Sequence, residues 1–350
     1  MIDEFYKGKK VLITGHTGFK GTWMCALLKM LGADVYGYSL DPPTNPSLFE
    51  LSEMSKKINS EIGDIRDFEH LNRYVQSVNP DIVFHLAAQP IVKTGYTEPR
   101  MTYETNVMGT VNILESVRNC KSVKSFVNIT TDKVYDNTDD KFVYKENDRL
   151  DGYDPYSNSK SCSELVTHSY KRSFFDMEDS CAISTVRAGN VIGGGDFADF
   201  RIIPDCVTAG IEKKDIIIRN PNSVRPFQHV LEPLFAYLVI AESQARDKKT
   251  SGCYNVGPNI EDCVSAGTIA DIFCKHWGGG LKWKNVSDNG PHESNFLRLD
   301  CSLVKETFNY SPHWNIEMAI IKVIEWSKVW ISGGDVYDCM IKQIREFING

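Results

Sequence analysis

Three glycines near the start of the chain limit its fold more than any other feature of the sequence. Gly15, Gly18 and Gly21 form a GxxGxxG loop, which follows an apolar run at 9–14 and opens a helical pattern at 19–31. Glycines at this spacing allow a tight turn and close approach of the backbone to a pyrophosphate, and a helix N-terminus offers unpaired N–H groups to the same phosphates. The loop lacks the Gly-Lys-Ser/Thr ending of a Walker A loop. It therefore predicts a dinucleotide site between the first strand and the first helix.

The first half of the chain repeats this alternation of short apolar strands and amphipathic helices. Further strands are expected at 33–40, 81–87, 123–130 and 181–187, and further helices at 67–77, 102–118 and 155–175. Alternation at these lengths implies βαβ units. The expected fold is α/β: a Rossmann-type doubly wound parallel sheet with a smaller, interleaved α/β substrate domain.

After residue 190 the sequence becomes rich in loop residues, and we expect a second domain there. The Rossmann domain is expected to cover 1–190, with a returning segment near 228–255. The second domain is expected at 191–227 and 256–350.

Composition argues against several function classes. The 46 acidic residues outnumber the 39 basic ones, and a formal net charge of -7 argues against a nucleic-acid partner. No segment approaches the roughly 18 consecutive apolar residues of a membrane helix, so no membrane partner is expected. The N-terminus does not have the pattern of a signal peptide, and we expect a cytoplasmic protein. The ten cysteines form no CxxC pair and the eight histidines no HExxH motif, so we expect free, mostly buried thiols and no metal.

A carboxylate at the end of the second strand bears on the choice of cofactor. Asp41 lies where an acidic residue would bind the adenosine ribose hydroxyls, and no Arg is near that strand end to accept a 2′-phosphate. NAD is therefore favoured over NADP. The alternative is that Asp41 only caps the turn before Pro42. Asp64 and Ile65, after another short strand, are expected to line the adenine.

A YxxxK pattern supplies a candidate acid–base group. Tyr156 and Lys160 lie on one face of the helix expected at 155–175, and a nearby ammonium lowers the pKa of a phenol so that it can take a hydroxyl proton. Tyr6 and Lys10 match the same pattern. Because they precede the first strand, far from the expected nicotinamide, we interpret them as a chance match.

A second group of polar residues follows the strand expected at 123–130. Thr131, Asp132 and Lys133 emerge where ligands bind in open α/β sheets, beyond the carboxyl end of a strand. The alternative is a polar turn that carries a solvated salt bridge.

Together these segments resemble the extended short-chain dehydrogenases and, within them, the nucleotide-sugar 4,6-dehydratases, most narrowly those that act on CDP-glucose. The Thr-Asp-Lys triplet is the most specific part, because related dehydratases that act on dTDP-glucose or GDP-mannose carry Glu where this chain has Lys133. The resemblance covers nearly the whole chain and rests on GHTGFKGTW (15–23), LDPPTNPSLFE (40–50), HLAAQP (85–90), NVMGTVNILE (106–115), TTDKVYDN (130–137), YDPYSNSK (153–160), RAGNVIGGGDF (187–197), RPFQHVLEPL (225–234) and LRLDCS (297–302).

The resemblance implies a role for each catalytic residue. Tyr156 would take the proton of the sugar's 4-hydroxyl while NAD takes the hydride from carbon 4. Thr131 would hydrogen-bond that oxygen, and Lys160 would assist Tyr156 and hold the nicotinamide ribose. Lys133 would then remove the hydrogen from carbon 5, and Asp132 would protonate the departing 6-hydroxyl. Lys133 must be neutral and Asp132 protonated for this, although a mutual ion pair favours the charged forms of both.

The resemblance also implies the binding residues and the assembly. For NAD these are Gly15, Thr17, Gly18, Phe19, Lys20, Gly21, Asp41, Asp64, Ile65, Leu86, Ala87, Ala88, Asn106, Tyr156 and Lys160. For CDP-glucose they are Gln89, Asn190, Arg201 and Arg225, and the alternative for Arg225 is an interdomain ion pair. His85 and His229 are expected to be packed inside the protein. Related enzymes usually pair through two helices per subunit, here 99–118 and 155–175, so a homodimer or homotetramer is expected.

Three other functions stay open at this point. A dehydratase of another nucleotide sugar would carry the same motifs. A nucleotide-sugar 4-epimerase needs Tyr156 and Lys160 but no acid and base pair, so Asp132 and Lys133 speak against it. A non-catalytic NAD-sensing protein could lose Tyr156, Lys160 or Thr131, and all three are present.

Overall fold

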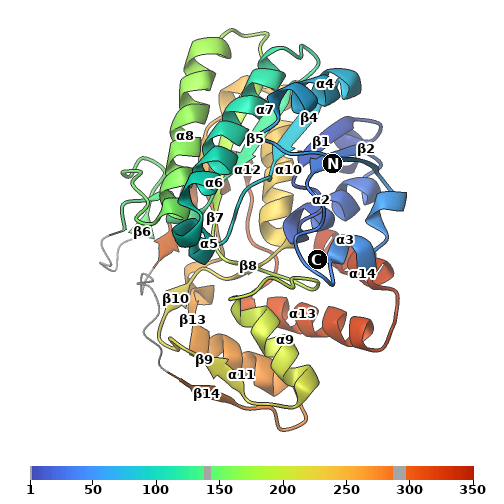
Figure 1. The fold of residues 1–350 in the computed structure, drawn as a ribbon, viewed down its shortest axis with the longest axis vertical. Helices are drawn as coiled ribbons and strands as arrows, with labels where there is room; N and C mark the ends of the chain where they lie inside the picture. The colour runs from blue at the N-terminus through green and yellow to red at the C-terminus, as the bar shows by residue number, and fades with distance from the viewer. Residues whose placement is uncertain (1, 138–142, 287–296) are drawn as a thin grey trace.

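The computed structural model describes residues 2–137, 143–286 and 297–350, and its centre is a seven-stranded parallel sheet (Figure 1). The strand order is β12-β7-β5-β4-β1-β2-β3. Because β1 lies between β2 and β4, the order reverses beside β1, and ligands bind at such a reversal in doubly wound sheets. In sheet order the strands are β12 (Cys253–Val256), β7 (Ala182–Ala188), β5 (Ser125–Ile129), β4 (Ile82–His85), β1 (Lys10–Thr14), β2 (Asp34–Ser39) and β3 (Asn59–Ile62).

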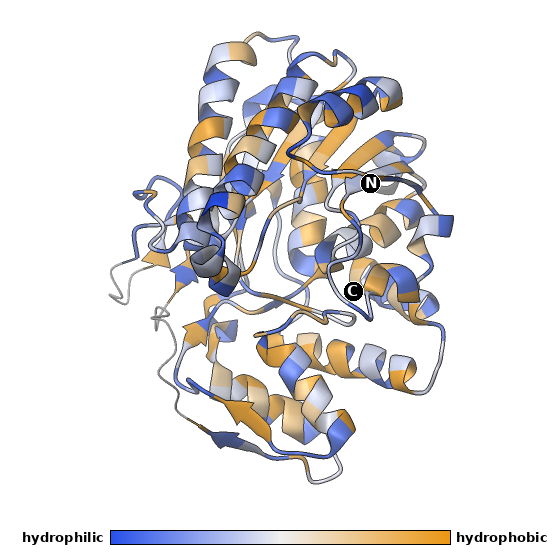
Figure 2. Ribbon diagram, viewed as in Figure 1, coloured by the Kyte–Doolittle hydropathy of each residue, from blue (hydrophilic) through white to orange (hydrophobic). Residues whose placement is uncertain are grey.

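Helices cover both faces of this sheet, and the strand β1 shows why. Side chains alternate along a strand, so Val11 and Ile13 join one core while Leu12 joins the other. The first core includes residues of α2 (Phe19–Met30), α10 (Leu231–Arg246) and α14 (Val336–Asn349), and the second includes residues of α4 (Phe68–Val78), α7 (Gly109–Arg118) and α8 (Pro155–Phe174). Figure 2 shows the consequence: the strands are largely hydrophobic, while the helices mix hydrophobic and hydrophilic residues.

The predicted strands and helices of the first half agree closely with these elements, with one exception. The helix expected at 102–118 is interrupted. It consists of α6 (Pro99–Tyr103), a π-helical turn η2 (Glu104–Met108) and α7. A π-helical turn inside a helix is uncommon and occurs often at functional sites.

A third core lies in the lower part of Figure 1, away from the large sheet. Its elements are β9 (Ile216–Ile218), β14 (Trp283–Asn285), α9 (Ile202–Glu212), α11 (Ala266–Trp277) and α13 (Ile316–Ile331). Three pairs of two-residue strands form small sheets separate from the large one: β8 (Val191–Ile192) with β11 (Gln228–His229), β10 (Val224–Arg225) with β13 (Val264–Ser265), and β6 (Val143–Tyr144) with β15 (Arg298–Leu299). The remaining helices are α1 (Ile2–Tyr6), α3 (Leu48–Leu51), η1 (Met54–Lys56), α5 (Val92–Thr97), η3 (Asp132–Val134), η4 (Lys248–Thr250), η5 (Ile260–Asp262) and α12 (Ser302–Phe308).

The architecture is the expected Rossmann-type α/β fold with an interleaved second unit. The exact domain boundaries stay a proposal, and the contacts bear on them in two places. The segment predicted to return near 228–255 supplies α10 and the edge strand β12. We propose that α14 also belongs with the Rossmann domain, although the prediction placed 256–350 in the second, because Met340 and Phe347 share a core with Leu27 of α2.

All ten cysteines are free, and six of them are buried. Among the described helices, none combines the length and the apolar character that crossing a membrane requires.

Candidate active site

In the glycine loop between β1 and α2, two of the three glycines cannot carry a side chain without a clash with backbone atoms. Gly15 has φ 79°, a left-handed conformation, and a Cβ there would lie 2.8 Å from the backbone nitrogen of Ala87. A Cβ on Gly21 would lie 2.1 Å from the carbonyl oxygen of Gly15. At Gly18 the nearest atom to a Cβ would be 3.5 Å away, an ordinary contact, so protein packing does not demand glycine there. A pyrophosphate bound on the loop would need the room that glycine leaves at this position, so the loop fits a dinucleotide.

Two neighbouring residues of the loop fasten it to the rest of the fold. The Thr17 hydroxyl donates to the carbonyl of Leu40 at 2.9 Å and lies 2.8 Å from the hydroxyl of Ser39. This ties the loop to the end of β2, and Asp41 is exposed just beyond it. The ring of Phe19 lies so near Gly193 that a Cβ there would be 2.9 Å from it.

The residues predicted to line the adenine follow β3. Asp64 is paired with Arg66, whose Nε lies 3.0 Å from Asp64 Oδ1, and this hydrogen bond holds the pKa of the Asp64 carboxyl below its usual value. Ile65 is buried against Gly109 of α7, where a Cβ would be 2.8 Å from it. The adenine contact stays a prediction for both.

Beyond β4, the partly exposed residues Leu86, Ala87 and Ala88 lead to a buried polar network. Asn106, in the π-helical turn, donates from Nδ2 to the carbonyl of Gln89 at 3.1 Å and to Ser159 Oγ at 2.9 Å, and its Oδ1 accepts from the Gln89 N–H at 2.8 Å. Asn106 therefore holds the loop after β4 against α8.

The Gln89 amide, predicted to bind substrate, is engaged within the protein. Its Nε2 donates to Thr102 Oγ1 at 2.8 Å, and its Oε1 accepts from the Ile91 N–H at 2.6 Å. These two bonds fix the orientation of the amide, which keeps one N–H hydrogen and one oxygen lone pair for a further contact.

The Thr131, Asp132 and Lys133 triplet lies just after β5, as predicted. Asp132 is 1% exposed, which excludes the alternative of a solvated salt bridge. Its Oδ1 accepts from the Thr131 hydroxyl at 3.0 Å and lies 3.6 Å from Lys133 Nζ, while Lys133 is partly exposed. Its Oδ2 is buried and has no hydrogen-bond partner among the described residues.

Tyr156 lies in the first turn of α8 and reaches this triplet. Asp154 caps the helix by accepting from the N–H groups of Tyr156 and Ser157 at 2.9 and 3.1 Å, and Pro155 occupies the first helical position. The phenol is close enough to Thr131 and Asp132 for both to act on its pKa, Thr131 lowering it and Asp132 raising it. The fold therefore brings together a phenol, a hydroxyl and a carboxyl from two different elements.

The predicted lowering of the Tyr156 pKa is wrong for the chain without ligands. Burial raises the pKa of Tyr156 to about 12, although the nearby Thr131 side chain opposes the rise. Lys160 is not among the main groups that shift this pKa, and its ammonium donates to the carbonyl of Ile129 at 3.0 Å. Burial also lowers the pKa of Lys160 to about 8, against the opposing charge of Glu164.

Lys20, predicted only as a cofactor contact, lies close to two of the predicted catalytic residues, Lys160 and Asp132. Its Nζ donates to the hydroxyl of Tyr237 on α10 at 3.3 Å. Burial, followed by the positive charges of Lys160 and Arg201, lowers the pKa of Lys20 to about 7. Arg201 is itself paired with Asp196 at 2.8 Å. No local sequence signal points to Tyr237, which is 217 positions from Lys20.

The segments of Asn190 and Arg225 lie side by side where the two units meet. The Asn190 carbonyl accepts from the Gln228 N–H at 2.9 Å, and a Cβ on Gly189 would be 2.5 Å from the Pro226 side chain. Arg225 is buried on β10. The two segments that carry these predicted substrate residues are thus brought together.

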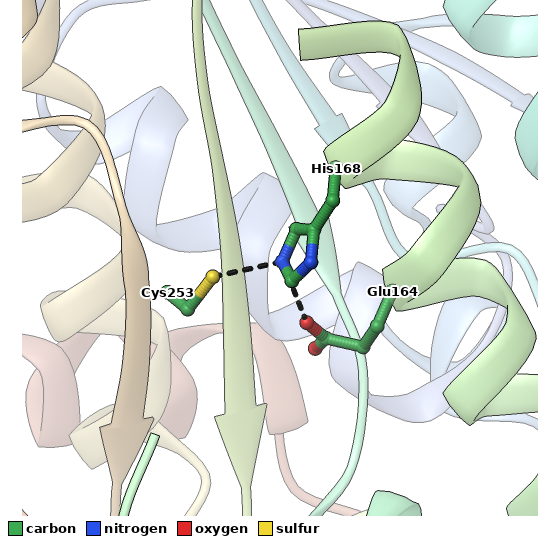
Figure 3. Close-up of side chains that lie close together, drawn as sticks. All are labelled: Glu164, His168 and Cys253. Atoms are coloured by element: carbon green, nitrogen blue, oxygen red, sulfur yellow. Dashed lines mark hydrogen bonds and ion pairs between the residues drawn. The ribbon is translucent and has the colours of Figure 1, made fainter. Parts of the chain in front are cut away.

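Glu164, His168 and Cys253 form a cluster next to the catalytic helix turn (Figure 3). His168 Nε2 lies 2.9 Å from Cys253 Sγ and 3.5 Å from Glu164 Oε2. The carboxylate of Glu164, however, accepts from Thr130 at 2.5 Å and from Arg187 at 2.9 Å. Because a metal ion would stand beside that guanidinium, we interpret the cluster as part of the framework that joins α8 to the edge of the sheet.

His85, His229 and Tyr6, which we did not expect to act in catalysis, are all buried inside the protein. His85 is buried between Thr14 and Thr110, and burial lowers its pKa to about 3. His229 is buried against the ring of Trp23. The Tyr6 hydroxyl donates to the carbonyl of Leu238 at 2.7 Å.

Comparison with known proteins agrees with this geometry. Residues 12–323 match the family model described as GDP-mannose 4,6 dehydratase. The chain is 45% identical over 355 residues to the CDP-glucose 4,6-dehydratase of Salmonella typhimurium, covering 100% of this chain and 99% of that protein. It is 25% identical to dTDP-glucose 4,6-dehydratase 1 of Escherichia coli, covering 91% of this chain and 92% of that protein.

Solved structures agree on the fold. The UDP-glucuronic acid 4-epimerase of Bacillus cereus, solved with UDP-glucuronic acid and NAD, superposes with a TM-score of 0.78 at 22% identity, covering 92% of this chain and 99% of that chain. The UDP-glucose 4-epimerase of Thermotoga maritima, solved with UDP-glucose, superposes with a TM-score of 0.79 at 19% identity, covering 92% and 99%. With a family model that spans most of its length and a relative at 45% identity, the chain belongs to the nucleotide-sugar 4,6-dehydratases.

Proposed function

We propose that this protein dehydrates CDP-glucose to CDP-4-keto-6-deoxyglucose with NAD as a resident cofactor. One observation carries the proposal. Thr131, Asp132 and Lys133 lie beyond the carboxyl end of β5, where Thr131 and Asp132 are near enough to Tyr156 to act on its pKa, in a chain that is 45% identical along its length to a CDP-glucose 4,6-dehydratase. An epimerase would not need the buried carboxyl of Asp132.

The glycine loop and the ends of β2 and β4 are the proposed NAD site. Gly18 leaves the room that a pyrophosphate needs, and α2 presents its N-terminus to the phosphates. Asp41 would bind the adenosine ribose and Lys160 the nicotinamide ribose. The other proposed contacts are Gly15, Thr17, Phe19, Lys20, Gly21, Asp64, Ile65, Leu86, Ala87, Ala88 and Tyr156, with Asn106 supporting the loop after β4. When bound, NAD accepts a hydride from carbon 4 of the sugar and returns it to carbon 6.

The phenol of Tyr156 takes the proton of the sugar's 4-hydroxyl, and Thr131 hydrogen-bonds the same oxygen. The resulting 4-ketone acidifies the hydrogen on carbon 5. Lys133 removes that hydrogen as a neutral amine, and its partial exposure allows it to lose a proton to solvent first. Asp132 protonates the departing 6-hydroxyl, which leaves as water. Its buried Oδ2, which has no hydrogen-bond partner among the described residues, is suited to this step.

The nucleotide diphosphate is proposed to lie where the two units meet. The segments of Asn190 and Arg225 lie side by side there, and a guanidinium can pair bidentately with phosphate oxygens. Arg201 would reach the sugar end of the substrate, because its charge acts on Tyr156. Gln89 acts through the loop that it fastens.

We also propose a cytoplasmic homodimer or homotetramer that pairs through the α6–α7 region and α8. Both helical regions expose apolar side chains: Met108 is 50% exposed and Leu165 is 53% exposed.

The test is incubation of the NAD-loaded protein in deuterated water with glucose linked to CDP, dTDP, UDP or GDP, followed by NMR and mass spectrometry. We expect conversion of CDP-glucose alone, with loss of water and incorporation of one deuteron at carbon 5. Conversion of another nucleotide sugar would change the nucleotide assigned to the substrate, and epimerisation without loss of water would refute the dehydration.

Two variants test the roles of the acid and the base. Asp132→Asn and Lys133→Met are each expected to leave an oxidised 4-keto sugar that keeps its 6-hydroxyl. Full dehydration by both variants would contradict the assignment. Lys145→Met, a change at an exposed lysine that only pairs with Asp300 at 3.8 Å, is the control.

A further inference from the structure

The proposed reaction has two stages that depend on one short segment of chain. Oxidation at carbon 4 uses Tyr156 and Thr131, whereas the loss of water uses Asp132 and Lys133. Thr131 directly precedes the short helix η3, and Asp132 and Lys133 lie within it. Because the acid and the base must each reach a different atom of the sugar, the position of η3 matters most for the loss of water.

The first end of this segment is fixed where β5 ends. Lys160 donates from Nζ to the carbonyl of Ile129 at 3.0 Å, and the Thr130 hydroxyl donates to Glu164 Oε1 at 2.5 Å. The N–H of Thr130 also donates to a carbonyl of β7 at 2.9 Å. All of these bonds lie before Thr131 in the chain, so they hold the residue of the oxidation stage from that side.

The other end of the segment is held by the hydroxyl of Ser161, a residue that has no role in the proposed reaction. Ser161 lies on α8 directly after Lys160 and is 2% exposed. Its Oγ donates to the carbonyl of Val134, the last residue of η3, at 2.7 Å and accepts from the N–H of Gly152 at 3.0 Å. The carbonyl of Ser157, one turn earlier in α8, is farther away at 3.1 Å. The single hydrogen of this hydroxyl is therefore better placed for Val134.

We propose, on the basis of the proposed function, that Ser161 is a positioning residue that aims Asp132 and Lys133 at the sugar for the loss of water. Its hydroxyl joins three backbone segments: the end of η3, the chain at Gly152, and the catalytic helix α8. Removal of the hydroxyl frees the Val134 end of η3, while the bonds at the end of β5 stay in place. Oxidation at carbon 4 is then nearly unaffected, and the loss of water is slowed.

The packing around η3 limits how far the turn can move. The side chain of Val134 is fully buried, and its carbonyl also accepts from the N–H of Asp151 at 3.0 Å. The next residue, Tyr135, forms an antiparallel bridge with Leu150. Loss of the Ser161 hydroxyl should therefore shift the turn slightly and not unfold it. A shift on the order of 1 Å can still cost roughly a hundredfold in rate, because the reacting groups must meet in a defined geometry.

The experiment is a single turnover of CDP-glucose by the NAD-loaded protein, with oxidation followed by NADH absorbance and loss of water by mass spectrometry of quenched samples. Ser161→Ala should oxidise the sugar at nearly the rate of the unmodified protein but lose water more slowly, on the order of ten- to a hundredfold. A 4-keto sugar that keeps its 6-hydroxyl should therefore accumulate. Ser327→Ala is the matched control and should behave like the unmodified protein. Ser327 is also a helix serine that is 2% exposed, and its hydroxyl donates to the carbonyl of Val323 in its own helix at 2.8 Å.

Equal slowing of both stages, slowing of oxidation alone, or no slowing at all would each overturn the proposal, because a hydroxyl that only supports the fold would not separate the stages. Failure of the proposed function looks different, since the unmodified protein would then convert no CDP-glucose.

Hydrogen exchange of the protein without substrate tests the anchor by itself. The amide of Gly152 should exchange faster in Ser161→Ala than in the unmodified protein, because it loses its acceptor. Equal exchange rates would refute the anchor. If Ser161→Ala does not fold, Ser161→Cys takes its place, since it keeps the shape of serine with a weaker S–H donor. The same selective slowing of water loss is expected from it, and equal slowing of both stages would again overturn the proposal.

Discussion

Replacing Glu164 by Gln tests how strongly the buried ion pair between Glu164 of α8 and Arg187 of β7 stabilises the fold. Glu164 and Arg187 are both fully buried, and their ion pair spans 2.9 Å (Figure 3 shows Glu164). The carboxylate also accepts from Thr130 and Thr185, at 2.5 and 2.7 Å. These contacts hold the pKa of Glu164 below its usual value even though burial acts in the opposite direction. Gln is nearly isosteric but leaves the charge of Arg187 uncompensated inside the protein.

The expected cost follows from that burial. Breaking a buried ion pair by removing one partner typically costs about 3–5 kcal/mol. For a chain of this length the entropy of unfolding is roughly 0.7 kcal/mol per kelvin, so the melting temperature should fall by about 4–7 °C. The pKa of Lys160 should also fall below its value of about 8, because Glu164 is the charge that raises it. The base-assisting ammonium would then be lost at a lower pH.

The assay is thermal and denaturant unfolding of Glu164→Gln beside two controls. Glu115→Gln breaks a pair with the exposed Arg118 and should change the free energy of unfolding by no more than about 1 kcal/mol. The double variant Glu164→Gln/Arg187→Met removes both charges and should recover much of the lost stability. If Glu164→Gln unfolds within 1 kcal/mol of the unmodified protein, the buried pair does not stabilise the fold as argued.

Two further predictions concern the cofactor loop and the catalytic lysine. Without NAD, Gly18→Ala should melt like the unmodified protein, but it should lose the stabilisation that NAD gives, about 2.7 kcal/mol at a hundred times Kd. Gly21→Ala should already be destabilised without NAD, because its Cβ would lie 2.1 Å from a carbonyl oxygen. Equal melting temperatures of the two ligand-free variants would contradict this. Lys160→Met should abolish turnover yet stabilise the ligand-free fold at pH 7 by up to about 3 kcal/mol, which is what a fall in pKa from 10.5 to about 8 amounts to. The folded-state pKa of Lys160 is about 8 and its usual value 10.5, so its protonation opposes folding below pH 8 and ceases to do so as the pH rises through that window. The advantage of Met should therefore shrink between pH 8 and 10.5 in unfolding experiments, and an advantage that grows with pH would refute the reasoning.

Much of the fold could be predicted from local patterns. The strand β1 and the loop at Gly15 to Gly21 were expected because apolar runs and glycine spacing reflect short-range sterics, and the structure confirms both. The interruption of the helix expected at 102–118 could not be predicted. Its π-helical turn contains Asn106, whose contacts with Gln89 and Ser159 span 17 and 53 residues and so leave no local signal.

The candidate site shows the same division. The sequence by itself determined which chemical groups are present. It also placed Thr131, Asp132 and Lys133 after a strand and Tyr156 at the start of a helix, near the carboxyl edge that the parallel strands share. Only the tertiary structure decided their electrostatic state. Burial raises the pKa of Tyr156, where the spacing to Lys160 suggested the reverse, and Lys160 donates to Ile129 instead. Likewise, Lys20 meets Tyr237 only after the chain has folded. Helical spacing fixes which residues share a face, but the loss of water and the choice of partner depend on surfaces that distant parts of the chain bring together.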